Sequence, residues 1–177
     1  MRQDYDVLIV GAGVVGSSLA LALSHLPLRI ALIEQIPFRF EPPLSLDSKP
    51  IALNVASMRI LQTLALWPAL AAYANPIRQV HISQQACFAQ SRISAKDMGV
   101  AQLGCVIPAA RLGSELIKAL SECAAGKTAA KASLELFNPA QCQSISKTKQ
   151  AWQVLFSTKK KKKIVIYPRL VIAADGS

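Results

Sequence analysis

The most constraining feature of this sequence is a glycine-rich segment that directly follows an aliphatic run near the N-terminus. Residues 6–16 read Asp-Val-Leu-Ile-Val-Gly-Ala-Gly-Val-Val-Gly, so a strand-like run leads into a GxGxxG pattern. An apolar stretch follows, and a second aliphatic run, residues 30–33, leads to Glu34. A GxGxxG pattern alone is weak evidence. A preceding strand, a following helix and an acidic residue about 20 positions downstream are together typical of a nucleotide-binding β-α-β unit.

Each glycine of this pattern has a predicted physical role. Gly11 permits the tight turn from strand to helix, Gly13 lets the backbone approach a pyrophosphate, and Gly16 lets the helix lie close to the strand. The amides of Val14 and Val15 belong to the first turn of the helix, where donors lack intrahelical acceptors and the helix dipole favours an anion. We therefore expect these five residues to bind the phosphates of a dinucleotide.

Glu34 indicates which dinucleotide is expected. A carboxylate at the end of the second strand can accept hydrogen bonds from both ribose hydroxyls, and its charge disfavours a 2′-phosphate. FAD or NAD is therefore favoured over NADP at this position. The β-α-β unit by itself leaves the choice between FAD and NAD open.

The composition excludes several classes of protein. With 177 residues and 52% hydrophobic content, the chain can bury a core and is not disordered. The four cysteines show no CxxC spacing, so we expect reduced thiols, no metal site and no disulfide framework. Residues 7–24 carry no charge, but glycines and serines interrupt them and Asp4 and Asp6 precede them. A buried strand and helix are therefore expected there, rather than a membrane span or a secretory signal.

The net charge of +10 is concentrated in one run, Lys159–Lys163, which supplies five positive charges. Strand-like segments at 152–156 and 164–167 flank this run, so the lysines are predicted to lie in a solvated hairpin loop. No aromatic residue is interleaved with the lysines, which argues against a nucleic-acid partner. Weak attraction to an anionic membrane surface is the favoured interpretation.

Further along the chain, helices and strands are predicted to alternate. Four prolines between residues 37 and 50 indicate an irregular connection, and Ser57 is the expected N-cap of a helix that ends near Trp67. Pro108 is expected in the first turn of another helix, which ends at Gly126. His81 is an isolated histidine, and no catalytic role is assigned to it. The predicted later strands cover 77–83, 87–94, 133–137, 142–146, 152–156, 164–167 and 170–174.

The last aliphatic strand delivers Ala174-Asp175-Gly176, at the carboxyl end where doubly wound sheets bind ligands. This motif and the GxGxxG unit together resemble the FAD-dependent aromatic hydroxylases related to para-hydroxybenzoate hydroxylase. In that family the aspartate of the second motif contacts the FAD pyrophosphate region and the bound nicotinamide nucleotide. The resemblance favours FAD over NAD. It implies an α/β fold, a Rossmann-like FAD-binding domain that is truncated and carries the start of a β-rich substrate domain.

Shorter segments resemble the ubiquinone-biosynthesis hydroxylases, and among these the 2-octaprenyl-6-methoxyphenol hydroxylases most closely. They include Ser-Lys-Pro-Ile-Ala-Leu at 48–53, Val-His-Ile-Ser at 80–83 and Leu-Gly-Cys-Val-Ile at 103–107. The resemblance places Lys49 near the flavin, where the family usually has an arginine with a planar bidentate fork. It also makes Arg111 a candidate for contact with the FAD phosphates.

The same resemblance implies a division of the chain into domains. Residues 1–75 and 99–177 would form two segments of the FAD-binding domain, and residues 76–98 would be strands of the substrate domain. Family members continue well beyond position 177, so the resemblance implies an amino-terminal portion that is inactive alone.

The implied activity is hydroxylation of a polyprenyl phenol in ubiquinone biosynthesis, with NAD(P)H as electron donor and O2 as oxygen source. No catalytic side chain is assigned, because the flavin carries the chemistry. A cytoplasmic protein is expected, peripheral to the inner face of the membrane or assembled with other pathway enzymes. Two alternatives stay open. An NAD-linked Rossmann oxidoreductase would leave the Ala-Asp-Gly motif unexplained, and a non-enzymatic remnant would bind nucleotide only in part.

Overall fold

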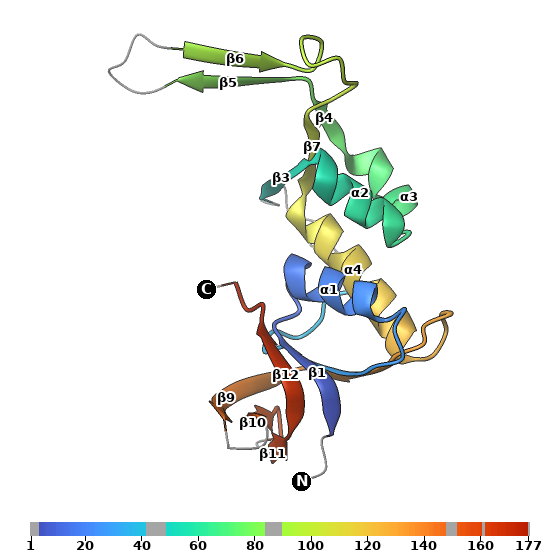
Figure 1. The fold of residues 1–177 in the computed structure, drawn as a ribbon, viewed down its shortest axis with the longest axis vertical. Coiled ribbons are helices and arrows are strands. Elements are labelled where there is room, and N and C mark those ends of the chain that lie inside the picture. The colour runs from blue at the N-terminus through green and yellow to red at the C-terminus, as the bar shows by residue number, and fades with distance from the viewer. Residues whose placement is uncertain (1–3, 42–48, 84–89, 148–151, 161, 177) are drawn as a thin grey trace. The chain divides into compact units, whose positions relative to one another are not determined.

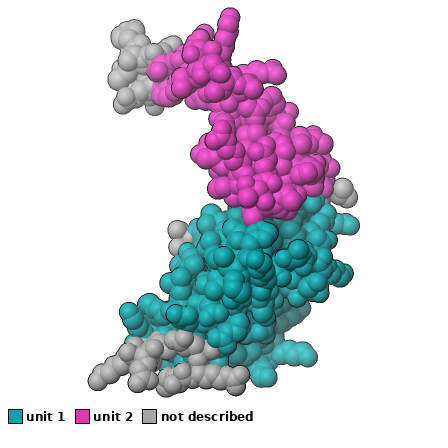
Figure 2. Space-filling view, turned by 45° about the vertical axis from the view of Figure 1, so that its right-hand side comes forward, with its two compact units in different colours: residues 1–42, 113–177 teal, residues 43–112 magenta. Residues whose placement is uncertain are grey.

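The structure, a computed structural model, describes residues 4–41, 49–83, 90–147, 152–160 and 162–176. The chain forms two compact units, residues 1–42 with 113–177 (unit 1) and residues 43–112 (unit 2), coloured separately in Figure 2. None of the described helices is long and apolar enough to cross a membrane.

Unit 1 is built on a four-stranded parallel sheet with the strand order β12-β1-β2-β8. The neighbouring strands β12 and β1 are labelled in Figure 1. The helix α1, Val14–Leu23, connects β1 to β2. In the register of the sheet, Val10 lies beside both Ile33 and Ala173, so β1, β2 and β12 end at the same edge. This arrangement confirms the predicted α/β fold with a parallel sheet. The strands are β1 Tyr5–Val10, β2 Arg29–Ile33, β8 Ser133–Phe137 and β12 Pro168–Ala173.

A three-stranded antiparallel sheet packs against one face of the parallel sheet. It consists of β9 (Ala140–Lys147), β10 (Trp152–Thr158) and β11 (Lys163–Ile166). Because side chains alternate along a strand, one face of each sheet supplies this core. The buried side chains of the core are Leu8, Ala31, Ile33, Ala140, Val154, Phe156 and Ile166. The opposite face of the parallel sheet carries Val7, Ile9, Ile30 and Leu32, all buried, and α1 lies on that side (Figure 1).

The described lysines of the run lie where β10 and β11 meet in a hairpin, as the sequence predicted, and Lys163 begins β11. The strands β10 and β11 pair antiparallel, and the Thr158 amide donates to the Lys162 carbonyl across the turn at 3.1 Å. Lys159 and Lys160 are exposed at its tip. Lys161 lies outside the described residues.

The helix α4, Ala109–Ala124, begins in unit 2 and continues into unit 1. Its apolar stripe is buried and consists of Leu112, Leu116, Leu120 and Cys123, which recur at helical spacing. The helix ends at Ala124, and Gly126, just beyond it, has a positive φ of 66°. The Lys127 amide donates to the Glu122 carbonyl at 3.0 Å, and the Gly126 amide donates to the Cys123 carbonyl at 3.1 Å. This pair of hydrogen bonds is the pattern of a Schellman cap. The predicted C-terminus is therefore confirmed, whereas Pro108 precedes the helix as the last residue of a strand.

Unit 2 contains two small antiparallel sheets and short helices. One sheet has the order β3-β7-β4 and the other is the hairpin of β5 and β6. The elements are β3 Pro50–Asn54, α2 Val55–Thr63, α3 Trp67–Leu70, a 3-10 turn at Ala71–Tyr73, β4 Asn75–Ile77, β5 Gln79–Ser83, β6 Gln90–Ser94 and β7 Gly104–Pro108. His81 lies in β5 opposite Arg92 and is exposed.

The first helix of unit 2 begins earlier than expected. Asn54, not Ser57, is the N-cap: its backbone is extended and its side-chain oxygen accepts a hydrogen bond from the Ser57 amide at 2.8 Å. Asparagine and serine are both strong N-cap residues, so composition alone does not choose between them. Pro50, expected in an irregular connection, begins β3, a position where a strand tolerates proline. Residues 42–48 and 87–89, part of the predicted connection and of one predicted strand, lie outside the described residues.

The two compact units divide the chain at residues 42 and 112, and the domain boundaries expected at residues 75 and 98 stay a prediction. The strand β7 pairs with both β3 and β4, so segments 50–54, 75–77 and 104–108 lie in the same unit. The assignment of residues 76–98 to a substrate domain stays a prediction.

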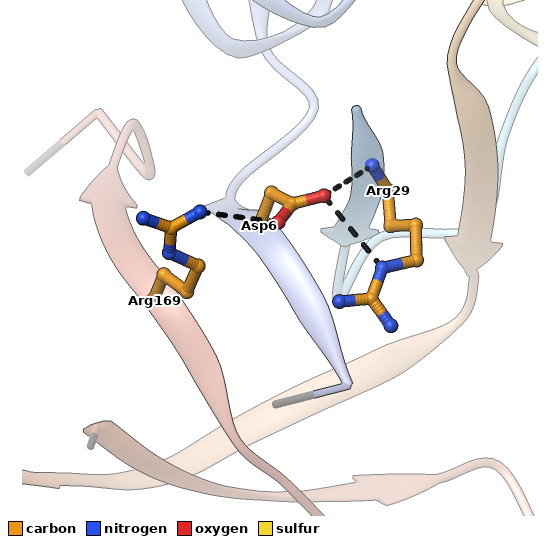
Figure 3. Close-up of polar contacts among 3 residues, drawn as sticks. All are labelled: Asp6, Arg29 and Arg169. Atoms are coloured by element: carbon orange, nitrogen blue, oxygen red, sulfur yellow. Dashed lines mark hydrogen bonds and ion pairs between the residues drawn. The ribbon is translucent and has the colours of Figure 1, made fainter. Parts of the chain in front are cut away.

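The amino edge of the parallel sheet carries a cluster of charges (Figure 3). Asp6 Oδ2 accepts a hydrogen bond from the Arg29 amide at 2.8 Å, and the carboxylate lies 3.6 Å from Arg29 Nε and 3.7 Å from an Arg169 guanidinium nitrogen. The Arg29 amide, and then the charges of Arg29 and Arg169, lower the pKa of Asp6. Nearby, the Tyr5 hydroxyl donates to the Glu135 carboxylate, and burial together with this bond raises the pKa of Tyr5.

Candidate nucleotide-binding site

The carboxyl edge of the parallel sheet brings together the glycine-rich loop and the end of β12. Gly11 follows β1 with a φ of +103°, which glycine adopts at little cost. Its amide donates to the Ile33 carbonyl at 2.8 Å, and the Ala174 amide donates to the Val10 carbonyl at 2.7 Å. A Cβ on Gly11 would overlap the Ala174 carbonyl. Gly11 therefore allows the loop to lie directly against the strand that carries Asp175.

The next two glycines shape the start of α1. Gly16 is buried, and a Cβ there would overlap the Gly11 carbonyl oxygen, so the helix packs closely on the turn. Gly13 is the exposed N-cap, and no atom lies within 4 Å of where its Cβ would be. The open position of Gly13 leaves room for a ligand next to the helix N-terminus.

The first turn of α1 supplies the donors that an anion requires. The first intrahelical hydrogen bond runs from the Ser17 amide to the Gly13 carbonyl at 2.9 Å. The amides of Val14, Val15 and Gly16 come before it, and helix geometry gives such amides no intrahelical acceptor. With the positive end of the helix dipole, these donors favour a phosphate group.

Glu34 is held against the glycine-rich loop. Its Oε2 accepts a hydrogen bond from the Ala12 amide at 2.6 Å, and its Oε1 accepts one from the Ile36 amide at 2.7 Å. Each carboxylate oxygen can accept more than one hydrogen bond, so both keep acceptor capacity for ribose hydroxyls. The carboxylate is therefore oriented before any ligand arrives.

A pocket of about 210 Å³ opens between these elements. Ligand sites usually measure roughly 300–1,000 Å³, so this pocket is suited to one part of a dinucleotide. Its lining combines the loop, the end of β2 and the second sheet, and consists of Val10, Gly11, Ile33, Glu34, Gln35, Ile36, Ala140, Cys142 and Asp175. The edge thus brings Gly11, Glu34 and Asp175 together around one space.

Cys142 forms an uncharged wall of this pocket. Burial, and then the negative charge of Asp175, raise the pKa of the Cys142 thiol. The thiol is therefore protonated near neutral pH and is unsuited to act as a nucleophile. Within the described ranges, no three His, Cys, Asp or Glu side chains are grouped so that they could hold a metal ion.

Asn138, between β8 and β9, is a site-forming residue that the sequence analysis missed. Its Nδ2 donates to the carbonyls of Ile36 at 2.6 Å and Glu34 at 3.2 Å, and its Oδ1 accepts from the Phe38 amide at 2.9 Å. The Ala140 amide also donates to the Glu34 carbonyl at 2.8 Å. An asparagine before a proline is a signal for a turn, but it does not reveal a partner 100 residues away. In the structure Asn138 fixes the segment that leaves β2 and carries Glu34.

Two of the nine predicted site residues lie in unit 2. Lys49 is exposed, and its carbonyl accepts a hydrogen bond from the Ala109 amide at 3.0 Å. Arg111 is half-buried, and its guanidinium lies 4.2 Å from the centre of the Tyr73 ring. A role for Lys49 and Arg111 toward the cofactor stays a prediction. The other seven residues lie in unit 1 and are Gly11, Gly13, Val14, Val15, Gly16, Glu34 and Asp175.

Comparison with known families identifies the nucleotide. A family model described as "FAD binding domain" matches residues 4–177. The chain belongs to this FAD-binding domain family. This membership makes FAD the cofactor and removes the ambiguity between FAD and NAD that Glu34 left open. The open position at Gly13, the amides of the first turn of α1 and the oriented Glu34 carboxylate fit the ADP half of FAD.

The relatives of this chain include two proteins whose names describe a function. Ubiquinone hydroxylase UbiL of Rhodospirillum rubrum is 34% identical over 82 residues, 44% of this chain and 18% of that protein. Ubiquinone hydroxylase UbiM of Neisseria meningitidis is 39% identical over 67 residues, 38% of this chain and 14% of that protein. An uncharacterized protein of Synechocystis, slr1300, is 26% identical over 175 residues, 99% of this chain and 39% of that protein. The chain therefore spans well under half of these relatives, and its resemblance to the ubiquinone hydroxylases is confirmed.

Solved structures agree on the fold. The anhydrotetracycline hydroxylase OxyS of Streptomyces rimosus superimposes with a TM-score of 0.74 at 17% identity, over 97% of this chain and 32% of that chain. The flavin-dependent monooxygenase PieE, solved with FAD and substrate, gives a TM-score of 0.70 at 19% identity, over 99% of this chain and 31% of that chain. The Rossmann-like FAD-binding fold predicted from the sequence is therefore confirmed.

Proposed function

We propose that this chain holds the ADP half of FAD in a flavin-dependent monooxygenase that hydroxylates a polyprenyl phenol in ubiquinone biosynthesis. The observation that carries the proposal is the geometry of one sheet edge, where an open helix N-terminus and an oriented Glu34 carboxylate lie together. The names of UbiL and UbiM support the substrate class, since both are similar to parts of this chain.

The residues of the chain bind and orient the cofactor. The amides of Val14 and Val15 donate to the pyrophosphate, and the Glu34 carboxylate accepts from the ribose hydroxyls. Asp175 faces the same pocket from the end of β12. When bound, FAD supplies the redox chemistry, with NAD(P)H as electron donor and O2 as oxygen source. No side chain of the described residues is assigned a proton-transfer step.

Lys49 and Arg111 complete the proposed cofactor contacts. Both carry positive charge, Lys49 directly before β3 and Arg111 in the first turn of α4. The family resemblance supports a contact of each with the phosphates or the flavin of bound FAD. Lysine offers a point charge where an arginine would offer a bidentate fork, so we expect a weaker contribution from Lys49. We also propose that strands 76–98 belong to the substrate-binding part of the enzyme.

A polyprenyl phenol partitions into membranes, so the proposed enzyme works at a membrane surface or receives its substrate from one. We propose a cytoplasmic protein that associates with the membrane periphery or with other enzymes of the pathway. The net charge of +10 supports attraction to an anionic surface.

The proposal is tested by titrating the chain with ADP, FAD and NAD and repeating the titration with Gly13→Val. We expect weak but saturable binding of ADP and FAD, and a loss of at least about 100-fold in both affinities in the variant, because the new side chain fills the phosphate position. A Cβ at Gly13 meets no neighbouring atom, so the variant stays folded by circular dichroism.

Gly113→Ala is the matched control. Gly113 also has open space around its Cβ position, but it lies within α4 and not in the glycine-rich loop. We expect the ADP affinity of the Gly113→Ala variant to equal that of the unmodified chain. Unchanged ADP affinity in Gly13→Val, or NAD bound more tightly than FAD, would remove the basis of the proposal.

A further inference from the structure

Almost all of the net charge of the chain lies in one segment. Residues 139–174 contain eight of the twenty Lys and Arg residues and none of the ten Asp and Glu residues, so this segment carries +8 of the total +10. The remaining residues are nearly neutral. Such a concentration of one sign of charge creates a local potential that a nearly neutral surface lacks.

The structure places four of these charges at one end of the hairpin formed by β10 and β11. Lys159, Lys160, Lys162 and Lys163 are all exposed there, and we call them the lysine tip. The hydrogen bond from the Thr158 amide to the Lys162 carbonyl closes the turn and keeps the four residues together. In the described part of the chain, no acidic side chain pairs with any of the four.

An aliphatic pair lies beside the lysine tip on the outer face of the hairpin. The inner face carries Val154, Phe156 and Ile166, which are buried in the core. Leu155 and Val165 pair across the hairpin on the other face, and Val165 is 41% exposed. Lys163 precedes Val165 by two residues, so their side chains leave the strand on the same side. The outer face therefore combines positive charge with exposed aliphatic surface.

We propose that the lysine tip docks this chain on a membrane surface rich in anionic lipid. Lysine ammonium groups suit lipid phosphates as point charges, and Leu155 and Val165 suit the apolar boundary beneath the headgroups. A nucleic-acid partner would favour aromatic platforms or a basic helix, and the tip carries neither. Docking would bring the chain to the membrane that holds the substrate class of the proposed function. Docking itself requires no bound FAD.

The test is co-sedimentation of the whole chain with vesicles of phosphatidylglycerol and phosphatidylcholine, compared with vesicles of phosphatidylcholine alone. The chain binds the anionic vesicles and is released by high salt. The variant Lys159→Gln, Lys160→Gln, Lys162→Gln, Lys163→Gln lowers the partition coefficient by roughly 600-fold, since each of the four lysines near an anionic surface contributes about fivefold. All four positions are exposed, so the melting temperature stays unchanged.

The matched control removes the same number of charges elsewhere. Arg59→Gln, Arg78→Gln, Lys96→Gln and Lys127→Gln alter four exposed cations outside the hairpin. In this control the partition coefficient for anionic vesicles falls by no more than about fivefold, the effect of one lysine. Equal losses of vesicle binding in the two variants would show that only the net charge of the chain matters, and would overturn the proposal. Equal binding of the unmodified chain to both kinds of vesicle would also overturn it.

Two further measurements separate the alternatives. Tighter binding to a DNA duplex than to anionic vesicles, lost in the tip variant, would assign the lysine tip to nucleic acid and overturn membrane docking. ADP titration of the tip variant separates docking from cofactor binding. Unchanged ADP affinity with lost vesicle binding supports two independent surfaces, whereas vesicle binding by a chain that binds no ADP supports docking and contradicts the proposed function.

Discussion

The two edges of the parallel sheet use their polar groups in opposite ways. At the amino edge, Asp6 forms ion pairs with Arg29 and Arg169 (Figure 3). The Tyr5 hydroxyl donates a hydrogen bond to the Glu135 carboxylate. At the carboxyl edge, the first turn of α1 directs amides toward open space at Gly13. Open space does not distinguish the edges, because a hollow of about 400 Å³ also lies beside the amino edge and is lined by Tyr5, Arg29 and Glu135. The polar groups distinguish them: at the amino edge they pair with one another, whereas at the carboxyl edge backbone donors and an oriented carboxylate are available to a ligand.

This contrast separates stability from binding. Groups that pair with each other contribute to folding and present little to a ligand, whereas donors at a helix N-terminus and an oriented carboxylate gain their partner on binding. Substitutions at the amino edge should therefore change the free energy of unfolding and leave nucleotide affinity unchanged. Substitutions at the carboxyl edge should change nucleotide affinity, and where they also alter the backbone they should change both.

The largest effect is expected for Gly11→Ala, because this residue belongs to both sides of the contrast. Alanine at a φ of +103° is strained, and its Cβ would overlap the Ala174 carbonyl. We expect a loss of about 3 kcal/mol or more in the free energy of unfolding, measured in urea, together with loss of ADP binding.

Gly99→Ala separates the two causes. Gly99 also has a positive φ, +64°, but no atom lies within 4 Å of its Cβ position. The Gly99→Ala substitution should lower the free energy of unfolding only by the backbone strain, about 1–2 kcal/mol, and should leave ADP affinity unchanged. If Gly11→Ala were no more destabilising than Gly99→Ala, the close approach of the loop to Ala174 would not matter for folding.

A smaller effect is expected for Asn138→Ala, which tests how the carboxyl edge is oriented. The variant loses hydrogen bonds to Glu34, Ile36 and Phe38, so the segment after β2 becomes less well fixed. We expect ADP affinity to fall about tenfold and the free energy of unfolding to fall by about 1–2 kcal/mol. The measurement is ADP titration beside urea unfolding.

The neighbouring exposed residue provides the control for this change. Gln141→Ala lies in β9 and should leave both quantities unchanged. Asn138→Asp keeps the acceptor for the Phe38 amide but places a carboxylate oxygen against the Glu34 and Ile36 carbonyls, so it should lower both quantities at least as much as Asn138→Ala. An ADP affinity in Asn138→Ala equal to that of Gln141→Ala would show that Glu34 is oriented without this turn.

The sequence predicted those parts of the fold that depend on local signals. The glycine pattern, the aliphatic runs and the lysine hairpin each lie within a short segment, and each was confirmed. The predicted start of α2 was wrong because asparagine and serine are both favourable N-cap residues. Only the backbone conformation shows that Asn54, not Ser57, is the N-cap. Asn138 was missed because its partners lie 100 residues earlier in the chain, at a distance over which sequence spacing carries no information.

The smallest effect is expected at the amino edge, for Asp6→Asn. Asparagine keeps an acceptor for the Arg29 amide but loses the attraction to the two guanidinium groups, which are largely exposed. We expect a loss of about 1 kcal/mol in the free energy of unfolding at pH 7 and no change in ADP affinity. Reduced ADP affinity in this variant would mean that the two edges are not independent.

The pH dependence identifies the charge of Asp6 as the cause. The pKa of Asp6 is lowered in the folded chain, first by the Arg29 amide and then by the charges of Arg29 and Arg169, relative to its ordinary value of 3.8. Its contribution is therefore fully present above that ordinary value and is lost as the pH falls through the folded-state pKa. The stability difference between the unmodified chain and Asp6→Asn should shrink as urea unfolding is repeated at progressively lower pH. If the difference in the free energy of unfolding stayed constant down to a pH at which Asp6 is protonated, the charge of Asp6 would not contribute to it. The effect would then be assigned to packing.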